Sequence, residues 1–209
     1  MVGQGVLREC LLDTDVGRIL SIVRAPTGQS EPKLRELVRK DFFDFSAVES
    51  ELAGYDACFF CLGVSSAGMK EADYRRVTYD ITLAAGRTLA RLNPDMTFVY
   101  VSGTGTDSSE KGSSMWARVK GKTENDLLRL PFKAAYMFRP GVIVPLHGAK
   151  SKTTFVRIFY RVLGPLLPLF YTLFPKYVTT TEQIGLAMLK VAKQGAPKSV
   201  LETSDINEI

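Results

Sequence analysis

The stretch Phe98–Lys120, FVYVSGTGTDSSEKGSSMWARVK, decides the fold class of this chain. Its aromatic and β-branched start predicts a strand at Thr97–Val101, and Ser102 then opens a loop of small polar residues. A helix is expected at Met115–Leu128, on which Trp116 and Lys120 are four residues apart, so that both side chains can face one cleft. A buried strand that leads through a loop into a helix is the repeating unit of a parallel α/β fold.

The rest of the chain repeats this alternation of strands and helices. We expect strands at Gly17–Val23, Lys40–Asp44, Asp56–Leu62 and Ala134–Phe138, and helices at Met1–Leu12, Pro32–Arg39, Ser46–Leu52, Ala72–Leu92 and Ile184–Ala192. Strict alternation of this kind predicts a parallel sheet that is covered by helices on both faces.

Composition and charge indicate how many domains the chain can form and which classes of partner it can bind. With 209 residues, 45% of them hydrophobic, the chain can bury the core of one domain. The net charge of +5 is uneven, because eight Lys and Arg residues and no Asp or Glu lie between Leu127 and Thr181. This stretch predicts an anionic ligand, surface or partner. Nucleic acid is not expected, since the basic residues alternate with bulky aliphatic ones and no recognition motif is present.

The cysteines and the single histidine suggest no metal site and no disulfide framework. Cys58 and Cys61 have C-x-x-C spacing, but they fall on an apolar strand, where residues three apart point to opposite faces. With Cys10 they are therefore interpreted as core thiols, and His147 has no cluster of further metal ligands around it. No charged and apolar leader opens the sequence, so we expect a cytoplasmic protein.

Residues 155–174, FVRIFYRVLGPLLPLFYTLF, allow three interpretations. The uninterrupted apolar part is short and holds Pro165 and Pro168, which argues against a membrane-spanning helix. The segment could cover a substrate cleft, form a homodimer interface, or lie on an anionic membrane surface through Arg157 and Arg161.

Several short motifs occur in the order typical of one enzyme family. They are a glycine near the start, Arg24 after the second expected strand of that family, Asp41-Phe42 after the third, Cys61-Leu62-Gly63 after the fourth, Val101-Ser102-Gly103 after the fifth, Lys120 on the next helix, and Arg139-Pro140-Gly141. On these motifs the chain resembles an atypical short-chain dehydrogenase/reductase of the epimerase-like and Tat-interacting-oxidoreductase-like branch, over Met1–Gly148.

The resemblance implies a doubly wound, Rossmann-like NAD(P)-binding domain at residues 1–148. Residues 149–209 would form a small C-terminal lobe, with a closing helix and strand, that belongs to the same domain. Family members open with a buried strand and a Gly-x-x-Gly-x-x-Gly motif, whereas this sequence begins at what resembles the last three residues of that motif, ending at Gly3. We therefore expect the first strand and two glycines to be absent, either because the sequence is shortened at its start or because the protein is truncated.

The resemblance also implies roles for individual residues. Gly3 would approach the pyrophosphate, Asp41 and Phe42 would flank the adenine, Cys61, Leu62 and Gly63 would lie over the nicotinamide ribose, Lys120 would hold ribose hydroxyls, and Pro140 and Gly141 would cover the carboxamide. Arg24 stands where an NAD-binding member would have Asp or Glu, and a guanidinium suits a 2′-phosphate, so NADP is expected rather than NAD.

The catalytic positions depart from the family pattern at two places. Ser102 and Lys120 match the expected residues, but Trp116 occupies the position of the catalytic Tyr and Thr78 that of an Asn which holds a water. An indole N–H donates a hydrogen bond but does not exchange protons near neutral pH. Two functions therefore stay open: an NADP(H)-dependent oxidoreductase with an altered active site and an unknown small-molecule substrate, or a non-catalytic NADP(H)-dependent interaction or redox-sensing module.

Overall fold

The computed structural model describes residues 1–149 and 176–209. Its strands are β1 (Ile19–Val23), β2 (Leu34–Val38), β3 (Ala57–Phe60), β4 (Thr97–Val101), β5 (Ala134–Arg139), β6 (Val142–Val144), β7 (Val178–Thr180) and β8 (Val200–Glu202). Its α-helices are α1 (Val2–Leu12), α2 (Glu49–Leu52), α3 (Glu71–Arg75), α4 (Ile81–Leu92), α5 (Met115–Leu128), α8 (Thr181–Gln194) and α9 (Thr203–Glu208), with a 3-10 turn at Ser46–Val48 and a π turn at Arg76–Asp80.

A four-stranded parallel sheet in the order β3-β4-β5-β8 forms the centre of the fold. On β4, Val99 pairs with Phe59 of β3 on one side and with Tyr136 of β5 on the other. Two further parallel pairs, β1-β2 and β6-β7, stand beside this sheet. The predicted α/β class with parallel strands is confirmed.

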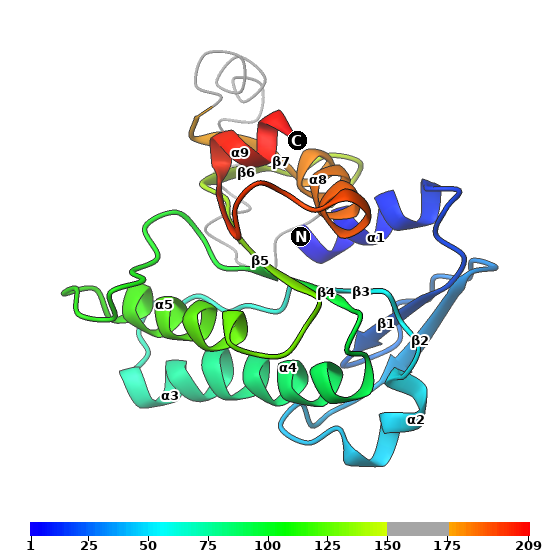
Figure 1. The fold of residues 1–209 in the computed structure, drawn as a ribbon, viewed down its shortest axis with the longest axis horizontal. Coiled ribbons are helices and arrows are strands. Elements are labelled where there is room, and N and C mark those ends of the chain that lie inside the picture. Colours follow the sequence, from blue (N-terminus) through cyan, green and yellow to red (C-terminus); the bar gives the residue numbers. More distant parts are fainter. Residues whose placement is uncertain (150–175) are drawn as a thin grey trace.

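Helices cover both faces of the sheet (Figure 1). Because successive residues of a strand point to opposite faces, β4 contributes to two separate cores. Val99 packs with α1 and α8 on one face, and Phe98 and Tyr100 pack with α4 and α5 on the other. All three side chains are almost completely buried.

The helix layer formed by α1 and α8 depends on close backbone contact. A Cβ atom at Gly5 would lie 2.5 Å from the Thr181 carbonyl oxygen, and one at Gly185 would lie 2.6 Å from Cγ of Glu9. Only glycine allows these two helices to approach so closely. The start of α8 is capped by Thr180, whose hydroxyl accepts a 2.9 Å hydrogen bond from the amide of Gln183.

Two predicted elements are wrong. The helix expected at Pro32–Arg39 is instead strand β2, and the strand expected at Lys40–Asp44 is a loop. The reason is tertiary: Leu34–Val38 pairs in parallel with all five residues of β1, and this pairing overrides a weak local helix preference. The helix expected at Ala72–Leu92 is present but is interrupted by the π turn at Arg76–Asp80.

The last part of the chain returns to the central sheet. Strand β8 pairs with β5, and α8 packs against α1. Residues 155–174, for which a lid, an interface or a membrane contact was expected, lie outside the described residues. Among residues 1–149 and 176–209, none of the helices is both long and apolar enough to cross a membrane.

Candidate functional site

The loops that follow β3, β4 and β5 meet at the carboxyl edge of the central sheet, because parallel strands end at the same edge. These loops begin at Cys61, Ser102 and Pro140. Beside them is a cavity of about 1430 Å³, which extends from this edge toward β1 and the start of α1. In open α/β sheets such an edge is the usual place for a ligand.

Nine of the twelve residues predicted for the site line this cavity. They are Gly3, Phe42, Cys61, Leu62, Gly63, Ser102, Lys120, Pro140 and Gly141. They come from α1, from the loop after β2, from the three strand ends and from α5, so the fold brings together residues that are far apart in the sequence. Arg24, Asp41 and Trp116 do not line the cavity.

Ser102 is held rigidly at the end of β4. Its amide donates a 2.9 Å hydrogen bond to the carbonyl oxygen of Phe138. Its hydroxyl is shared between the carboxylate of Glu124 and that same carbonyl oxygen, 3.2 Å away. The hydroxyl proton of Ser102 is therefore already engaged by protein acceptors.

Lys120 reaches the cavity from α5, and its ammonium group donates to the carbonyl oxygen of Ser102. Burial lowers the pKa of Lys120 to about 8, and the nearby carboxylate of Glu124 acts in the opposite direction. A group with this pKa can gain or lose a proton close to neutral pH.

A buried ion pair between Glu124 and Arg139, which no sequence pattern had indicated, lies behind these two residues. The carboxylate of Glu124 is 1% exposed and accepts hydrogen bonds from Arg139 Nε, at 3.1 Å to Oε1 and 3.2 Å to Oε2. Arg139 also lies 3.3 Å from a carboxylate oxygen of Glu202. The sequence spacing could have predicted that Glu124 is buried, because Glu124 follows Lys120 by four residues on one helix and so shares its inward face.

Trp116 and Thr78, which differ from the residues that the resemblance implies, do not line the cavity. The ring of Trp116 packs on Gly105, where a Cβ atom would lie 3.4 Å from its Cη2. Thr78 is buried within the π turn at Arg76–Asp80. Lys120 lines the cavity and Trp116 does not, although the two residues are four apart on α5.

The predicted adenine end of the site is only partly assembled. Phe42 lines the cavity and meets Phe45 edge to face, with ring centroids 6.3 Å apart. Asp41 is exposed and accepts a 2.8 Å hydrogen bond from the amide of Phe43. Arg24 is exposed directly after β1.

The three cysteines are free thiols in the cavity wall. Burial raises the pKa of Cys10, Cys58 and Cys61 to about 12, so all three are protonated at neutral pH. Protonated thiols are poor nucleophiles and poor metal ligands.

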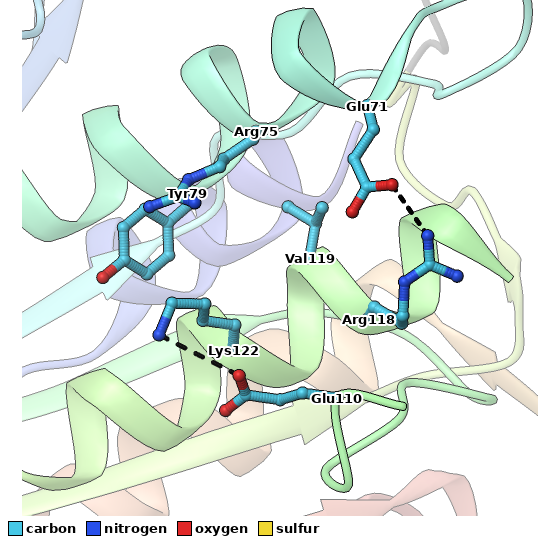
Figure 2. Close-up of a pocket in the computed structure, with 7 residues that line it drawn as sticks. All are labelled: Glu71, Arg75, Tyr79, Glu110, Arg118, Val119 and Lys122. Carbon is cyan, nitrogen blue, oxygen red and sulfur yellow. Dashed lines mark hydrogen bonds and ion pairs between the residues drawn. The ribbon is translucent and has the colours of Figure 1, made fainter. Parts of the chain in front are cut away.

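A second, smaller cavity of about 100 Å³ lies between the α3–π-turn segment and α5 (Figure 2). Arg118 donates a 2.7 Å hydrogen bond to Glu71, and Arg75 and Lys122 lie over the ring of Tyr79. Lys122 also pairs with Asp126 at 3.1 Å. Because the charged groups here already have partners within the chain, this cavity is interpreted as part of the contact between the two helical segments.

No family model matches the chain. Among curated proteins it is similar to protein FMP52-1, mitochondrial, of Scheffersomyces stipitis, with 25% identity over 146 residues that cover 69% of this chain and 63% of the relative. It is also similar to protein FMP52, mitochondrial, of Eremothecium gossypii, with 28% identity over 146 residues, 69% of this chain and 62% of the relative. The chain thus spans less than two thirds of the length of these relatives. The expected cytoplasmic location is wrong on this comparison, because both relatives are named mitochondrial proteins.

Three solved structures illustrate the likeness of the fold. The Bordetella bronchiseptica enzyme WbmF in complex with NAD+ has a TM-score of 0.63 at 13% identity, over 99% of this chain and 73% of that chain. The Helicobacter pylori ADP-L-glycero-D-manno-heptose-6-epimerase has a TM-score of 0.64 at 15% identity, over 99% and 76%. A thiolation-reductase di-domain from an archaeal non-ribosomal peptide synthetase has a TM-score of 0.69 at 11% identity, over 97% and 67%. Together with the parallel sheet and its two helical layers, this likeness confirms that the chain has the predicted Rossmann-like fold.

Proposed function

We propose that the protein binds a nicotinamide dinucleotide at the carboxyl edge of its sheet. The observation that carries this proposal is the convergence of nine predicted residues on one cavity, among them Gly3, Gly63, Lys120 and Gly141. The fit is chemically reasonable: a Cβ at Gly63 would meet nothing within 4 Å, which leaves open space at the backbone beside the cavity. The amino end of α1 also borders the cavity, and helix amino ends attract phosphate.

We further propose that NADP is preferred over NAD, on the basis of Arg24. Its exposed guanidinium directly follows β1, and a guanidinium binds a 2′-phosphate through two parallel hydrogen bonds. No carboxylate stands at position 24 to bind a ribose hydroxyl instead.

Calorimetric titration of the 209-residue chain with NADPH and with NADH tests both proposals. NADPH is expected to bind more tightly, and Arg24→Glu is expected to weaken NADPH by about tenfold or more while leaving NADH nearly unchanged. Arg87→Glu, the same charge change on the exposed side of α4, is the matched control. Binding of neither nucleotide contradicts dinucleotide binding, and equal affinities of wild type and Arg24→Glu for NADPH contradict the NADP preference.

The first candidate activity is that of an oxidoreductase or epimerase-like enzyme on an unidentified small molecule. When bound, the dinucleotide would supply hydride chemistry. On the protein side, Lys120 is the group that can hold or release a proton near neutral pH, while Glu124 and Arg139 keep Ser102 in place.

A second candidate is a dinucleotide-dependent interaction or redox-sensing module without turnover. It is favoured by two observations: the hydroxyl of Ser102 is already engaged by Glu124 and Phe138, and Trp116 packs on Gly105 instead of lining the cavity. NADPH oxidation in the presence of a panel of aldehydes and ketones separates the two. Turnover by the wild type contradicts the second candidate, and activity that appears only in Trp116→Tyr contradicts the first.

We also propose a mitochondrial location, because the two relatives carry that word in their names. Fractionation of cells that express the tagged full-length protein tests it, and recovery in the cytosolic fraction contradicts it. Homodimer formation and peripheral membrane contact through residues 155–174 remain predictions. They can be checked by sedimentation of the protein alone and with anionic liposomes.

A further inference from the structure

Lys120 stands apart from the other charged side chains that line the large cavity. Among the described residues of the cavity wall, these others are Asp15, Arg18, Asp56 and Lys193. The first three precede β1 or β3 and so lie at the amino ends of these strands, and Lys193 donates a 2.6 Å hydrogen bond to Asp15. At the carboxyl edge, the described part of the wall therefore presents one charged side chain, that of Lys120.

Lys120 forms no ion pair with any residue of 1–149 or 176–209. Its ammonium group donates to the carbonyl oxygen of Ser102. The carboxylate of Glu124, one turn further along α5, is held instead by Arg139 and by the hydroxyl of Ser102. A hydrogen bond to a carbonyl oxygen uses one N–H, so the lone pair of the neutral amine stays available for reaction.

The hydroxyl groups near Lys120 are committed to acceptors within the protein. The loop after β4 borders the amine, because a Cβ atom at Gly103 would lie 4.0 Å from Nζ of Lys120. In this loop the hydroxyl of Ser102 donates to the acceptors described above, and those of Thr104 and Thr106 donate to backbone carbonyl oxygens at 3.0 and 2.7 Å. The nucleophile that this part of the wall offers to a ligand is therefore the nitrogen of Lys120.

The protonation of Lys120 fits such a role. Burial lowers its pKa to about 8, so roughly one tenth of the molecules carry the neutral amine at pH 7. An ordinary lysine, with a pKa near 10.5, is neutral in roughly 1 of 3,000 molecules at this pH. Lysines that attack carbonyl groups are activated in this way, by removal from water.

The wall beside Lys120 is apolar. Leu62 and Val64 follow β3, Pro140 and Ile143 follow β5, and all four line the cavity. Leu62 and Val64 are among the large hydrophobic side chains that are exposed in this structure. A compound that reaches Lys120 along this wall gains most when its own body is uncharged and apolar.

We propose that Lys120 is a nucleophilic amine that forms an imine with small, uncharged aldehydes or ketones that have an apolar body. Nζ bonds to the carbonyl carbon, and the electron pair of the C=O bond moves to the oxygen. Both N–H protons pass through solvent to this oxygen, which leaves as water when the C=N bond forms. The proposal goes beyond the proposed function and needs no dinucleotide, because nothing is oxidised or reduced.

Reductive labelling of the wild-type chain tests the proposal. The protein is incubated at pH 7 with benzaldehyde and sodium cyanoborohydride, which reduces an imine to a stable secondary amine. Tandem mass spectrometry of peptides then gives the rate of labelling at each amine, with the α-amine of Met1 scored separately. Lys122 is the internal control, because it lies on the same helix and pairs with Asp126 at 3.1 Å, and this contact raises its pKa.

The folded chain is expected to be labelled at Lys120 at least about tenfold faster than at Lys122. In urea that unfolds the chain, the two rates should become equal, because the difference depends on burial. Glyoxylate, a charged aldehyde, is the matched control probe and should show a smaller preference for Lys120 than benzaldehyde does. No substitution is needed, so a variant that fails to fold cannot imitate either result.

Equal labelling of Lys120 and Lys122 in the folded chain overturns the proposal. A preference for Lys120 that persists in urea also overturns it, because the reactivity would then come from the local sequence and not from the cavity. An equal preference with glyoxylate overturns the assignment to uncharged compounds. Failure of the dinucleotide proposal is recognised separately, by fast labelling of Lys120 in a chain that binds neither NADPH nor NADH.

Discussion

Strands β4 and β1 are both five-residue apolar strands in parallel pairing, yet they differ in burial. β4, TFVYV, lies between β3 and β5 and is buried along almost its whole length. β1, ILSIV, pairs with β2 and is only half-buried at every position. The comparison shows that burial of a strand depends on how many neighbours it has, and not only on its own hydrophobicity.

The two regions also differ in their polar contacts. The central sheet is held at its carboxyl edge by the buried pair Glu124–Arg139, which links α5 to β5. The β1–β2 region has the surface pair Arg35–Glu51, in which the side chain of Arg35 is 66% exposed. Buried and exposed ion pairs respond very differently to the loss of one partner.

The largest effect is expected from Glu124→Gln. It leaves the largely buried guanidinium of Arg139 with one carboxylate partner, the partly exposed Glu202, and with the hydroxyl of Ser108, and it should lower the free energy of unfolding by about 3–5 kcal/mol. The control Glu51→Gln breaks the surface pair and should change the free energy of unfolding by less than about 1 kcal/mol. Urea denaturation of both variants measures these changes. Similar losses of unfolding free energy in the two variants would contradict the expected difference between the buried and the surface pair.

Gly121→Ala should be nearly as damaging. A Cβ atom at this position of α5 would lie 1.8 Å from the carbonyl oxygen of Asp107, so the loop after β4 must move, at a cost of about 3 kcal/mol. Gly17→Ala, just before β1, adds a Cβ that meets nothing within 4 Å, and it should be nearly neutral. Thermal unfolding of the pair is the measurement, and a stable Gly121→Ala protein would refute the close contact.

A matched pair of leucines tests the packing difference directly. Leu201 of β8 is 1% exposed, and Leu201→Ala should lower the free energy of unfolding by about 3 kcal/mol. Leu20 of β1 is half-buried beside the cavity, so Leu20→Ala should cost about half as much. Equal losses would mean that β1 is packed as tightly as the central sheet.

The smallest effect concerns pH. Burial lowers the pKa of Lys120 to about 8 in the folded protein, below its unfolded value near 10.5, so the unfolded chain binds more protons between these two values. Stability should therefore rise from about pH 8 to 10.5, and this rise should be smaller in Lys120→Met by about 1–2 kcal/mol, allowing for partial exposure. The measurement is the free energy of unfolding as a function of pH for both proteins. The same pH dependence in wild type and Lys120→Met would contradict the lowered pKa of Lys120.

Much of the fold follows from local patterns. The strand at Thr97–Val101 and the helix at Met115–Leu128 are confirmed to the residue. Both have strong signals: an aromatic and β-branched run between breakers, and an apolar face that recurs at helical spacing. The convergence of Cys61, Ser102 and Pro140 could also be predicted, because parallel strands present their carboxyl ends at one edge.

Other features could not be read from local patterns. The strand nature of Leu34–Val38 depends on β1, which lies more than ten residues earlier in the chain. The engagement of Ser102 by Glu124 depends on a side chain 22 residues away. The sequence by itself determined the α/β alternation and the residue types at the strand ends, since these arise from backbone preference and hydrophobic period. Only the tertiary structure decided which charges are buried together and that a cavity separates β1 from β3, because both depend on contacts between segments that are remote along the chain.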